Sequence, residues 1–198
     1  MMKKPPALLA LLPLLAGLSG CISFSAKPPP SLLTLKTAAA VPVGRTETAT
    51  PQRSITVNVP VVPDSLAVER VPVQATDTSI AYVKDAQWSE PPAKLFARLV
   101  ADTITAKTDW VVLGSNQSRV DPGARLTGEL RHFGIDAATH EAVVTYDAAL
   151  LRDGATDVEK QRFEARVPIS SITPGPVGEA INQAANQVAG EVADWLGK

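Results

Sequence analysis

Cysteine and histidine are scarce in this chain of 198 residues, which contains one Cys and two His. A single Cys excludes an internal disulfide, so a hydrophobic core must hold the fold together. His132 and His140 match no common zinc-ligand spacing, and there is no second Cys to complete such a site. We therefore expect no bound metal.

A strong charge of either sign is also absent. Lys and Arg number 19 against 20 Asp and Glu, which gives a formal net charge of -1 at pH 7. Nucleic-acid affinity depends on basic side chains that neutralise phosphates, and no basic cluster stands out along the sequence. We therefore expect no nucleic-acid partner.

Common catalytic motifs are missing as well. The chain has no Gly-x-Ser-x-Gly nucleophile motif and no Gly-x-Gly-x-x-Gly phosphate loop. Two acidic pairs, Asp64 with Glu69 and Asp153 with Asp157, fall in predicted loops, where water solvates the carboxylates. These observations predict a protein that is not an enzyme and that uses no dissociable cofactor.

What the sequence does contain is a secretory signal at its N-terminus. Lys3 and Lys4 precede an apolar run over residues 7–18. That run is about 12 residues long, whereas a helix needs about 20 to cross the hydrocarbon of a bilayer. We predict that residues 1–20 form a signal peptide that is removed on secretion.

The signal ends in Leu18-Ser19-Gly20-Cys21, which resembles the bacterial lipobox. In a lipobox the Cys is acylated on sulfur and becomes the first residue, so the expected prosthetic group is covalent lipid on Cys21. Two or three acyl chains suffice for stable membrane attachment, which a single chain does not provide. The alternative is an ordinary secreted protein with an incidental Cys. Asp after the Cys is typical of inner-membrane lipoproteins; the residue here is Ile22, which implies an outer-membrane anchor that faces the periplasm.

The mature chain divides into a tether and one domain. Residues 21–31 are polar and end in the Pro28–Pro30 run, which favours an extended, semi-rigid linker. Residues 32–198 then form the folded part. A domain of about 150 residues can bury roughly 70% of its unfolded surface, enough for one core without disulfides.

Apolar periodicity predicts two helices and several strands in this domain. One helix covers 92–106 with Ser89 as its N-cap, and a second covers 177–196. Short connections between the later strands require antiparallel pairing. We predict an α+β fold in which a single antiparallel β-sheet carries both helices on one face. The strands are expected at 32–37, 54–59, 68–73, 79–83, 110–113, 125–131, 142–150 and 162–167.

Three large aromatic residues near the first helix are candidates for a partner surface: Tyr82, Trp88 and Trp110. Such side chains could stack on a sugar or a lipid, but the favoured interpretation is packing under the helix. His132 falls on the apolar-facing phase of its predicted strand.

Several segments carry a family resemblance. They include Val68–Val73, the block Ile80–Pro92 with its Tyr, Trp and double Pro, Phe163, and the Ala-rich closing helix through Ala193–Trp195. On these residues the chain resembles the ABC-type transport auxiliary lipoprotein family, which includes the paraquat-inducible lipoprotein component of intermembrane transport systems. Only Cys21 carries over with a defined role.

The resemblance implies an accessory subunit for a lipid-transport system. Its partners would be an MCE-domain protein and the associated ABC permease and ATPase, which the lipoprotein would dock at a membrane. A homo-oligomer is a further implication. Two alternatives stay open at this point: a structural or assembly lipoprotein of another envelope complex, and a carrier that binds a hydrophobic ligand itself.

Overall fold

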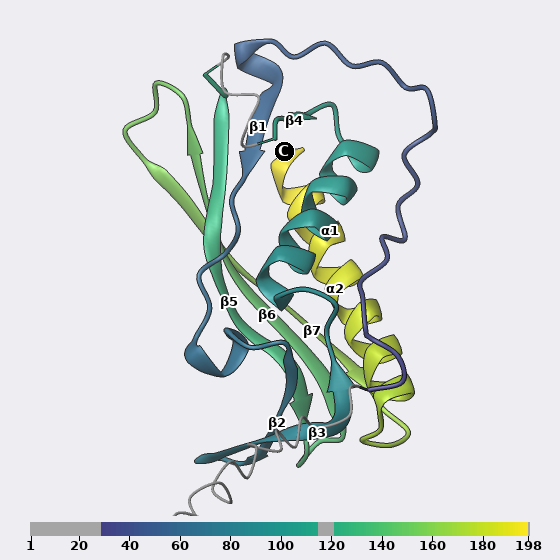
Figure 1. Ribbon diagram of the computed structural model, residues 1–198. Coiled ribbons are helices and arrows are strands. Elements are labelled where there is room, and N and C mark those ends of the chain that lie inside the picture. Colours follow the sequence, from purple (N-terminus) through teal and green to yellow (C-terminus); the bar gives the residue numbers. More distant parts are fainter. Residues whose placement is uncertain (1–28, 115–120, 198) are drawn as a thin grey trace, which may run out of the picture.

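A seven-stranded sheet with two α-helices on one face forms the folded part of the chain (Figure 1). The computed structural model describes residues 29–114 and 121–197. The α+β class predicted from the order of elements is confirmed. The predicted signal peptide, Cys21 and most of the tether lie outside the described residues.

Three long strands make up one half of the sheet. β5 (Ala124–Asp136), β6 (Glu141–Arg152) and β7 (Val158–Pro168) form an antiparallel meander. Its connections are short, which is why consecutive strands must run in opposite directions. This half agrees with the sequence prediction.

The other half of the sheet contains parallel pairs, so the sheet is mixed rather than wholly antiparallel. β1 (Ser54–Val57) runs parallel to β5 and to the short β4 (Val111–Val112). β2 (Arg70–Thr76) runs parallel to β5 and antiparallel to β3 (Ser79–Gln87). The prediction missed these parallel pairs because they join strands that are far apart in sequence, and the helix between them provides the crossover.

Both helices begin at prolines. α1 spans Pro92–Lys107 and α2 spans Pro174–Leu196. The predicted N-cap Ser89 is wrong: Pro91 precedes the first helical residue in an extended conformation, and no side chain caps the helix. A residue before proline is driven out of the helical region, so the helix cannot start earlier.

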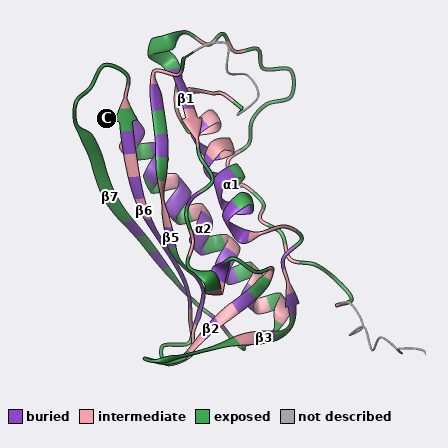
Figure 2. Cartoon of the chain, turned by 60° about the vertical axis from the view of Figure 1, so that its left-hand side comes forward, coloured by how far each residue is buried: buried purple, intermediate pink, exposed green. Residues whose placement is uncertain are grey.

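The helices cover the inner face of the sheet (Figure 2). α2 lies across β6 and β7, and α1 packs beside α2. Inward-facing residues of β6 are fully or almost fully buried, as Val144 (0% exposed) and Leu150 (1%) illustrate. Small residues along α2, including Ala184, Ala185 and Ala189, are also buried, which lets the helix approach the sheet closely. Neither helix in the described ranges is long and apolar enough to cross a membrane.

A β-bulge changes the phase of β5 near its middle. The pairing with β6 shifts register between Leu130 and His132, so Arg131 is an inserted residue. Leu130 and Phe133 therefore both face the helices, while His132 is exposed. The prediction that His132 lies on the apolar-facing side is wrong for this reason.

Residues 33–50 form a strap that runs over the helical layer before the chain enters β1 (Figure 1). The predicted strand at 32–37 is reduced to one parallel bridge, between Leu33 and Trp88. Two side chains of α2 then hold the strap. Asn182 Oδ1 accepts a hydrogen bond from the Lys36 amide at 2.8 Å, and Asn186 bonds both to the Ala38 amide (2.7 Å) and to the Lys36 carbonyl (3.0 Å).

Replacing Asn186 with alanine should loosen this strap without unfolding the domain. The substitution removes both hydrogen bonds to the strap and one to the Asn182 carbonyl at a half-buried site, so we expect a loss of about 1 kcal/mol in the free energy of unfolding. Hydrogen exchange should accelerate at the amide of Ala38. Gln187→Ala, an exposed position on the same helix, is the matched control; equal exchange in both variants would contradict the role of Asn186.

Candidate partner-binding surfaces

The three aromatic residues singled out in the sequence lie at two separate places. Tyr82 is in β3 and Trp88 follows that strand, whereas Trp110 immediately precedes β4. β3 and β4 lie at opposite ends of the sheet order. The structure therefore does not bring the three together into one surface.

Trp88 belongs to the core. It is 0% exposed, and its ring centroid lies 5.3 Å from that of Phe133. Phe96 continues the cluster at 6.2 Å from Phe133 and 5.2 Å from Tyr146. The indole Nε1 of Trp88 has no hydrogen-bond partner among the described residues. A partner protein cannot reach this side chain in the folded domain, which agrees with the packing interpretation.

Tyr82 is half-buried and stabilises the β2–β3 hairpin. The guanidinium carbon of Arg70 lies 4.0 Å from the centre of its ring, within the range of a cation–π contact. Arg70 is in the neighbouring strand. This contact within the hairpin gives Tyr82 a structural role that needs no binding partner.

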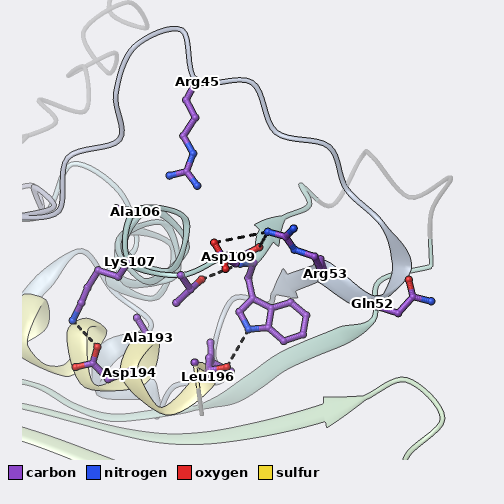
Figure 3. Close-up of a pocket in the computed structure, with 12 residues that line it drawn as sticks. Arg45, Gln52, Arg53, Ala106, Lys107, Asp109, Ala193, Asp194 and Leu196 are labelled. Atoms are coloured by element: carbon purple, nitrogen blue, oxygen red, sulfur yellow. Dashed lines mark hydrogen bonds and ion pairs between the residues drawn. The ribbon is translucent and has the colours of Figure 1, made fainter.

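Trp110 lines a hollow at the end of the molecule where both helices terminate (Figure 3). Its indole Nε1 donates a hydrogen bond to the Leu196 carbonyl in the last turn of α2, at 3.1 Å. The Arg152 guanidinium carbon lies 5.9 Å from the Trp110 ring centroid. Trp110 therefore closes the end of a helix whose last carbonyls lack partners within the helix.

Basic residues in this hollow bind carbonyl and carboxylate groups at the ends of the two helices or just beyond them. Arg45 donates to the Thr105 carbonyl at 3.1 Å, and Arg53 donates to the Asp109 carbonyl at 3.2 Å. Lys107 pairs with Asp194 of α2 at 2.8 Å, as drawn in Figure 3. Cations are favourable near the carbonyl end of a helix dipole. Their side chains are thus already engaged, and this hollow is explained by the fold.

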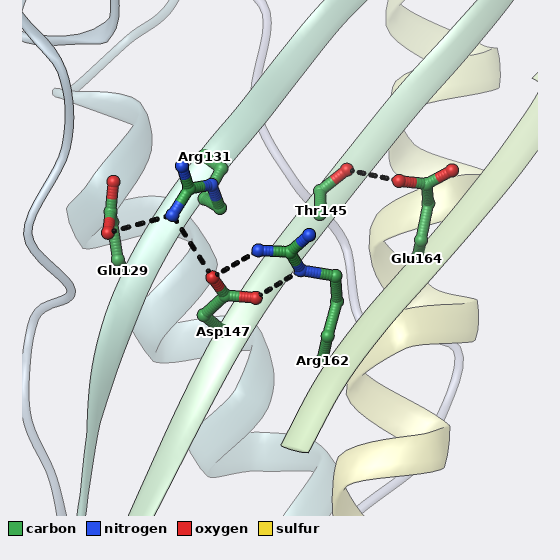
Figure 4. A network of polar contacts seen from close by, with 6 residues as sticks. All are labelled: Glu129, Arg131, Thr145, Asp147, Arg162 and Glu164. Carbon is green, nitrogen blue, oxygen red and sulfur yellow. Dashed lines mark hydrogen bonds and ion pairs between the residues drawn. The ribbon is translucent and has the colours of Figure 1, made fainter. Parts of the chain in front are cut away.

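The outer face of β5, β6 and β7 is different because no helix covers it (Figure 2). Its centre is an ion-pair network around Asp147 (Figure 4). Arg162 donates two hydrogen bonds to this carboxylate, of 2.6 and 2.7 Å. Arg131 donates to Asp147 at 3.2 Å and to Glu129 at 3.3 Å, which ties the three strands together. Hydrogen bonds from Arg162, supported by Arg131, lower the pKa of Asp147.

A second polar group lies beside the first on the same face. Thr145 is buried (2% exposed) and donates to Glu164 at 2.9 Å (Figure 4). Arg166 in turn donates to Glu164 at 2.9 Å and to Glu141 at 3.5 Å. The three arginines of the two groups are thus all engaged with carboxylates of the same face.

The free energy of unfolding should depend on pH through the ionisation of Asp147. Its folded pKa is lowered, so its contribution is present above the unfolded pKa of about 3.9 and is lost as pH falls through the folded value. At pH 7, Asp147→Asn should lower the free energy of unfolding by up to about 1 kcal/mol. That difference should vanish in strong acid. Asp157→Asn, which removes a carboxylate without an ion pair in the described chain, is the control. If the free energy of unfolding of Asp147→Asn differed from that of the wild type by the same amount in strong acid as at pH 7, the prediction would be contradicted.

The described residues offer little for acid–base or metal chemistry. Among them, no group of three or more His, Cys, Asp or Glu side chains could hold a metal ion. Burial raises the pKa of Tyr146, whose hydroxyl donates to the Thr127 carbonyl at 2.9 Å. That phenol therefore stays protonated and acts as a structural group. His140 sits in the β5–β6 turn with a positive φ of 56°.

Sequence reasoning did not identify the Asp147 network. The alternation within residues 142–150 could have placed Asp147 on the face opposite Tyr146, since adjacent strand residues point to opposite sides. Its partners depend on register, which sets Asp147 opposite both Glu129 and Arg162. Single-sequence patterns do not fix that register, and the bulge at Arg131 alters it further.

Comparison with known proteins gives one family and several solved structures with a similar fold. Residues 33–193 match the family described as ABC-type transport auxiliary lipoprotein component. No curated protein gives a significant match. The crystal structure of protein XCC0632 from Xanthomonas campestris, of family DUF330, has a TM-score of 0.65 at 21% identity, covering 86% of this chain and 94% of that one. An uncharacterized protein has a TM-score of 0.62 at 18% identity, covering 76% and 96% respectively.

Proposed function

Because the chain belongs to the ABC-type transport auxiliary lipoprotein component family, we propose that it is the membrane-anchored docking subunit of an ABC transport system that carries an MCE-domain protein. The system would move lipid between the inner and outer membranes. The family match over residues 33–193 is the observation that carries this proposal. In this role the protein binds partners and breaks no bonds.

The arrangement of the domain supports a docking role. One face of the sheet is covered by helices and the strap, and the other is open. The polar groups in the hollow at the helix ends are bonded to one another or to helix carbonyls. An open sheet face offers contact area to a protein partner.

The proposed anchor would enter the domain at one end. Acyl chains on Cys21 would hold the tether at the membrane, and the described chain enters the fold at Leu33, beside Trp88. From Cys21 to Leu33 the chain can span at most roughly 40 Å when fully extended. The tether would therefore reach the domain at its β3 end. Ile22 favours the outer membrane as the site of the anchor.

Affinity purification from detergent-solubilised membranes tests the proposal. The full-length lipoprotein, with an epitope tag after Lys198, should recover an MCE-domain protein together with an ABC permease and ATPase. The same tag on an unrelated lipoprotein of that membrane is the control. Recovery of a different envelope complex would instead support an assembly role, and a preparation without any of these partners would exclude the proposed function.

The carrier alternative makes a separate prediction. A protein that carries a hydrophobic ligand should retain lipid after purification, beyond the acyl chains on its own cysteine. Native mass spectrometry of the acylated protein distinguishes the two cases, because bound lipid adds mass that is lost on collisional activation. The docking proposal expects no such mass.

A further inference from the structure

We propose that the part of the outer sheet face farthest from the tether binds an extended protein segment that is both acidic and aliphatic. The surface, here named the distal patch, consists of Arg125 on β5, Ala149 and Leu151 on β6, and Val158 and Lys160 on β7. The inference rests on the proposed docking function and deepens it, because it gives the chemistry of the partner.

The register of the meander brings these five residues to one face. Leu151 lies directly opposite Arg125 on one side and Val158 on the other, and Ala149 lies opposite Lys160. Directly opposed residues share a side of the sheet. Leu150, the neighbour of Leu151, points inward and is 1% exposed, so the patch lies on the side away from the helices.

Two large aliphatic side chains stand exposed in the patch. Leu151 is 40% exposed and Val158 is 50% exposed, and they are cross-strand neighbours. Val61, which is 72% exposed, lines a hollow beside the patch together with Ala149 and Lys160. Contiguous exposed apolar side chains bordered by polar ones are typical of a surface that binds another molecule.

The two cations of the patch are not held in ion pairs within the described structure. Arg125 and Lys160 are exposed, and neither forms an ion pair with any residue in the described ranges. Asp121 and Asp153 line a hollow beside Arg125 without pairing with it. By contrast, Arg162 on the same face is fully engaged with Asp147. Within the described structure, Arg125 and Lys160 are therefore cations of this face that remain free to pair with carboxylates of a partner.

The charge and the position of the distal patch favour one kind of occupant over two others. A second copy that presented the same patch would set Arg125 and Lys160 against like charges, which opposes a symmetric contact. A membrane surface is the less favoured occupant, because the domain would have to turn over on its tether to bring the patch to the bilayer. The tether leads to Leu33, near the end of the meander where Glu141 pairs with Pro168, whereas the patch lies about ten residues along β6, roughly 30 Å away. An extended chain with carboxylates and aliphatic side chains matches both the charge and the apolar floor.

A peptide-binding measurement tests the inference on the mature, acylated protein in detergent. The probe is a fluorescent 12-residue peptide of alternating Glu and Val, compared with a Lys–Val and a Glu–Ser peptide of equal length. We expect fluorescence anisotropy to detect binding of the Glu–Val peptide alone, weakened by added salt. Arg125→Glu combined with Lys160→Glu should weaken it at least about tenfold, as should Leu151→Ser combined with Val158→Ser.

Matched controls lie elsewhere on the domain. Lys94→Glu reverses an exposed, unpaired cation on α1, and Ile172→Ser removes an exposed aliphatic side chain before α2. Both should bind the Glu–Val peptide as tightly as the wild type. Circular dichroism would confirm that every variant is folded. Absence of binding, equal binding of the Lys–Val peptide, or equal loss in the controls would overturn the inference.

Two further measurements exclude other occupants. Light scattering would reveal self-association that depends on Leu151 and Val158, and a dye on Leu151→Cys would shift to the blue in phosphatidylglycerol vesicles if the patch entered the bilayer. Either result would overturn the inference. If the wild type recovers transport partners and the patch variants still recover them, the inference fails while the docking function stands. If the wild type recovers no transport partners, the docking function fails. The binding of the Glu–Val peptide then tests the distal patch independently of that function.

Discussion

Replacing Cys21 with alanine should abolish acylation and end attachment of the mature protein to the membrane through lipid. The thiol is the proposed acylation site, and without acyl chains only the signal peptide could hold the chain at a bilayer. We expect either a soluble periplasmic protein or an uncleaved precursor, because lipobox processing follows acylation. Membrane fractionation after a high-salt wash, with metabolic labelling by a fatty-acid analogue, measures both attachment and acylation.

Ile22→Asp is the matched control for this experiment. It leaves the thiol in place, so acylation and membrane attachment should persist. The variant should move from the outer to the inner membrane, which density-gradient separation would detect. Continued fatty-acid labelling of the Cys21→Ala protein, or a cleaved Cys21→Ala protein that stays attached after the wash, would contradict the lipid anchor.

The largest expected loss of stability comes from Trp88→Ala. Trp88 is fully buried against Phe133, and truncating a buried Trp to Ala typically costs about 3–5 kcal/mol through lost contacts and the cavity that remains. Urea denaturation of the mature protein, followed by circular dichroism, measures the change in free energy of unfolding. A loss of this size is a large fraction of the stability of a single domain.

Two comparisons make the Trp88 result specific. Trp88→Phe should cost much less than Trp88→Ala, because the indole N–H has no partner in the described structure and its removal breaks no hydrogen bond. Trp110→Ala removes a half-buried ring and one bond to Leu196, so it should also cost less. Equal losses at positions 88 and 110 would contradict the central place of Trp88 in the core.

Sequence patterns predicted the elements with strong local signals. The apolar stripes placed α1 and α2 to within a few residues, because helix periodicity needs no knowledge of distant contacts. The alternation in β6 and β7 likewise predicted which residues face the helices. The start of α1 was harder to place, since two prolines at positions 91 and 92 replaced the expected side-chain cap.

Contacts between distant segments could not be predicted in the same way. The parallel pairing of β1 with β5 joins residues about 70 positions apart, as Ile55 and Ala124 show. The bulge at Arg131 and the ion pairs of Asp147 depend on register, which the two-residue period leaves open. Of the aromatic candidates, the local sequence could not tell that Trp88 is core and Trp110 closes a helix end.

The Leu33–Trp88 bridge determines how a mechanical load on the proposed anchor would enter the domain. A pull from the membrane first meets two backbone hydrogen bonds, from the Leu33 amide to the Gln87 carbonyl (2.7 Å) and from the Ser89 amide to the Leu33 carbonyl (2.8 Å). The Leu33 side chain also lies close to Gly178, so that a Cβ there would come within 2.8 Å of it. Force would thus pass into the sheet and α2 at this point. The strap after Leu33 would then carry no force, and the helical layer would keep its packing while the tether is pulled.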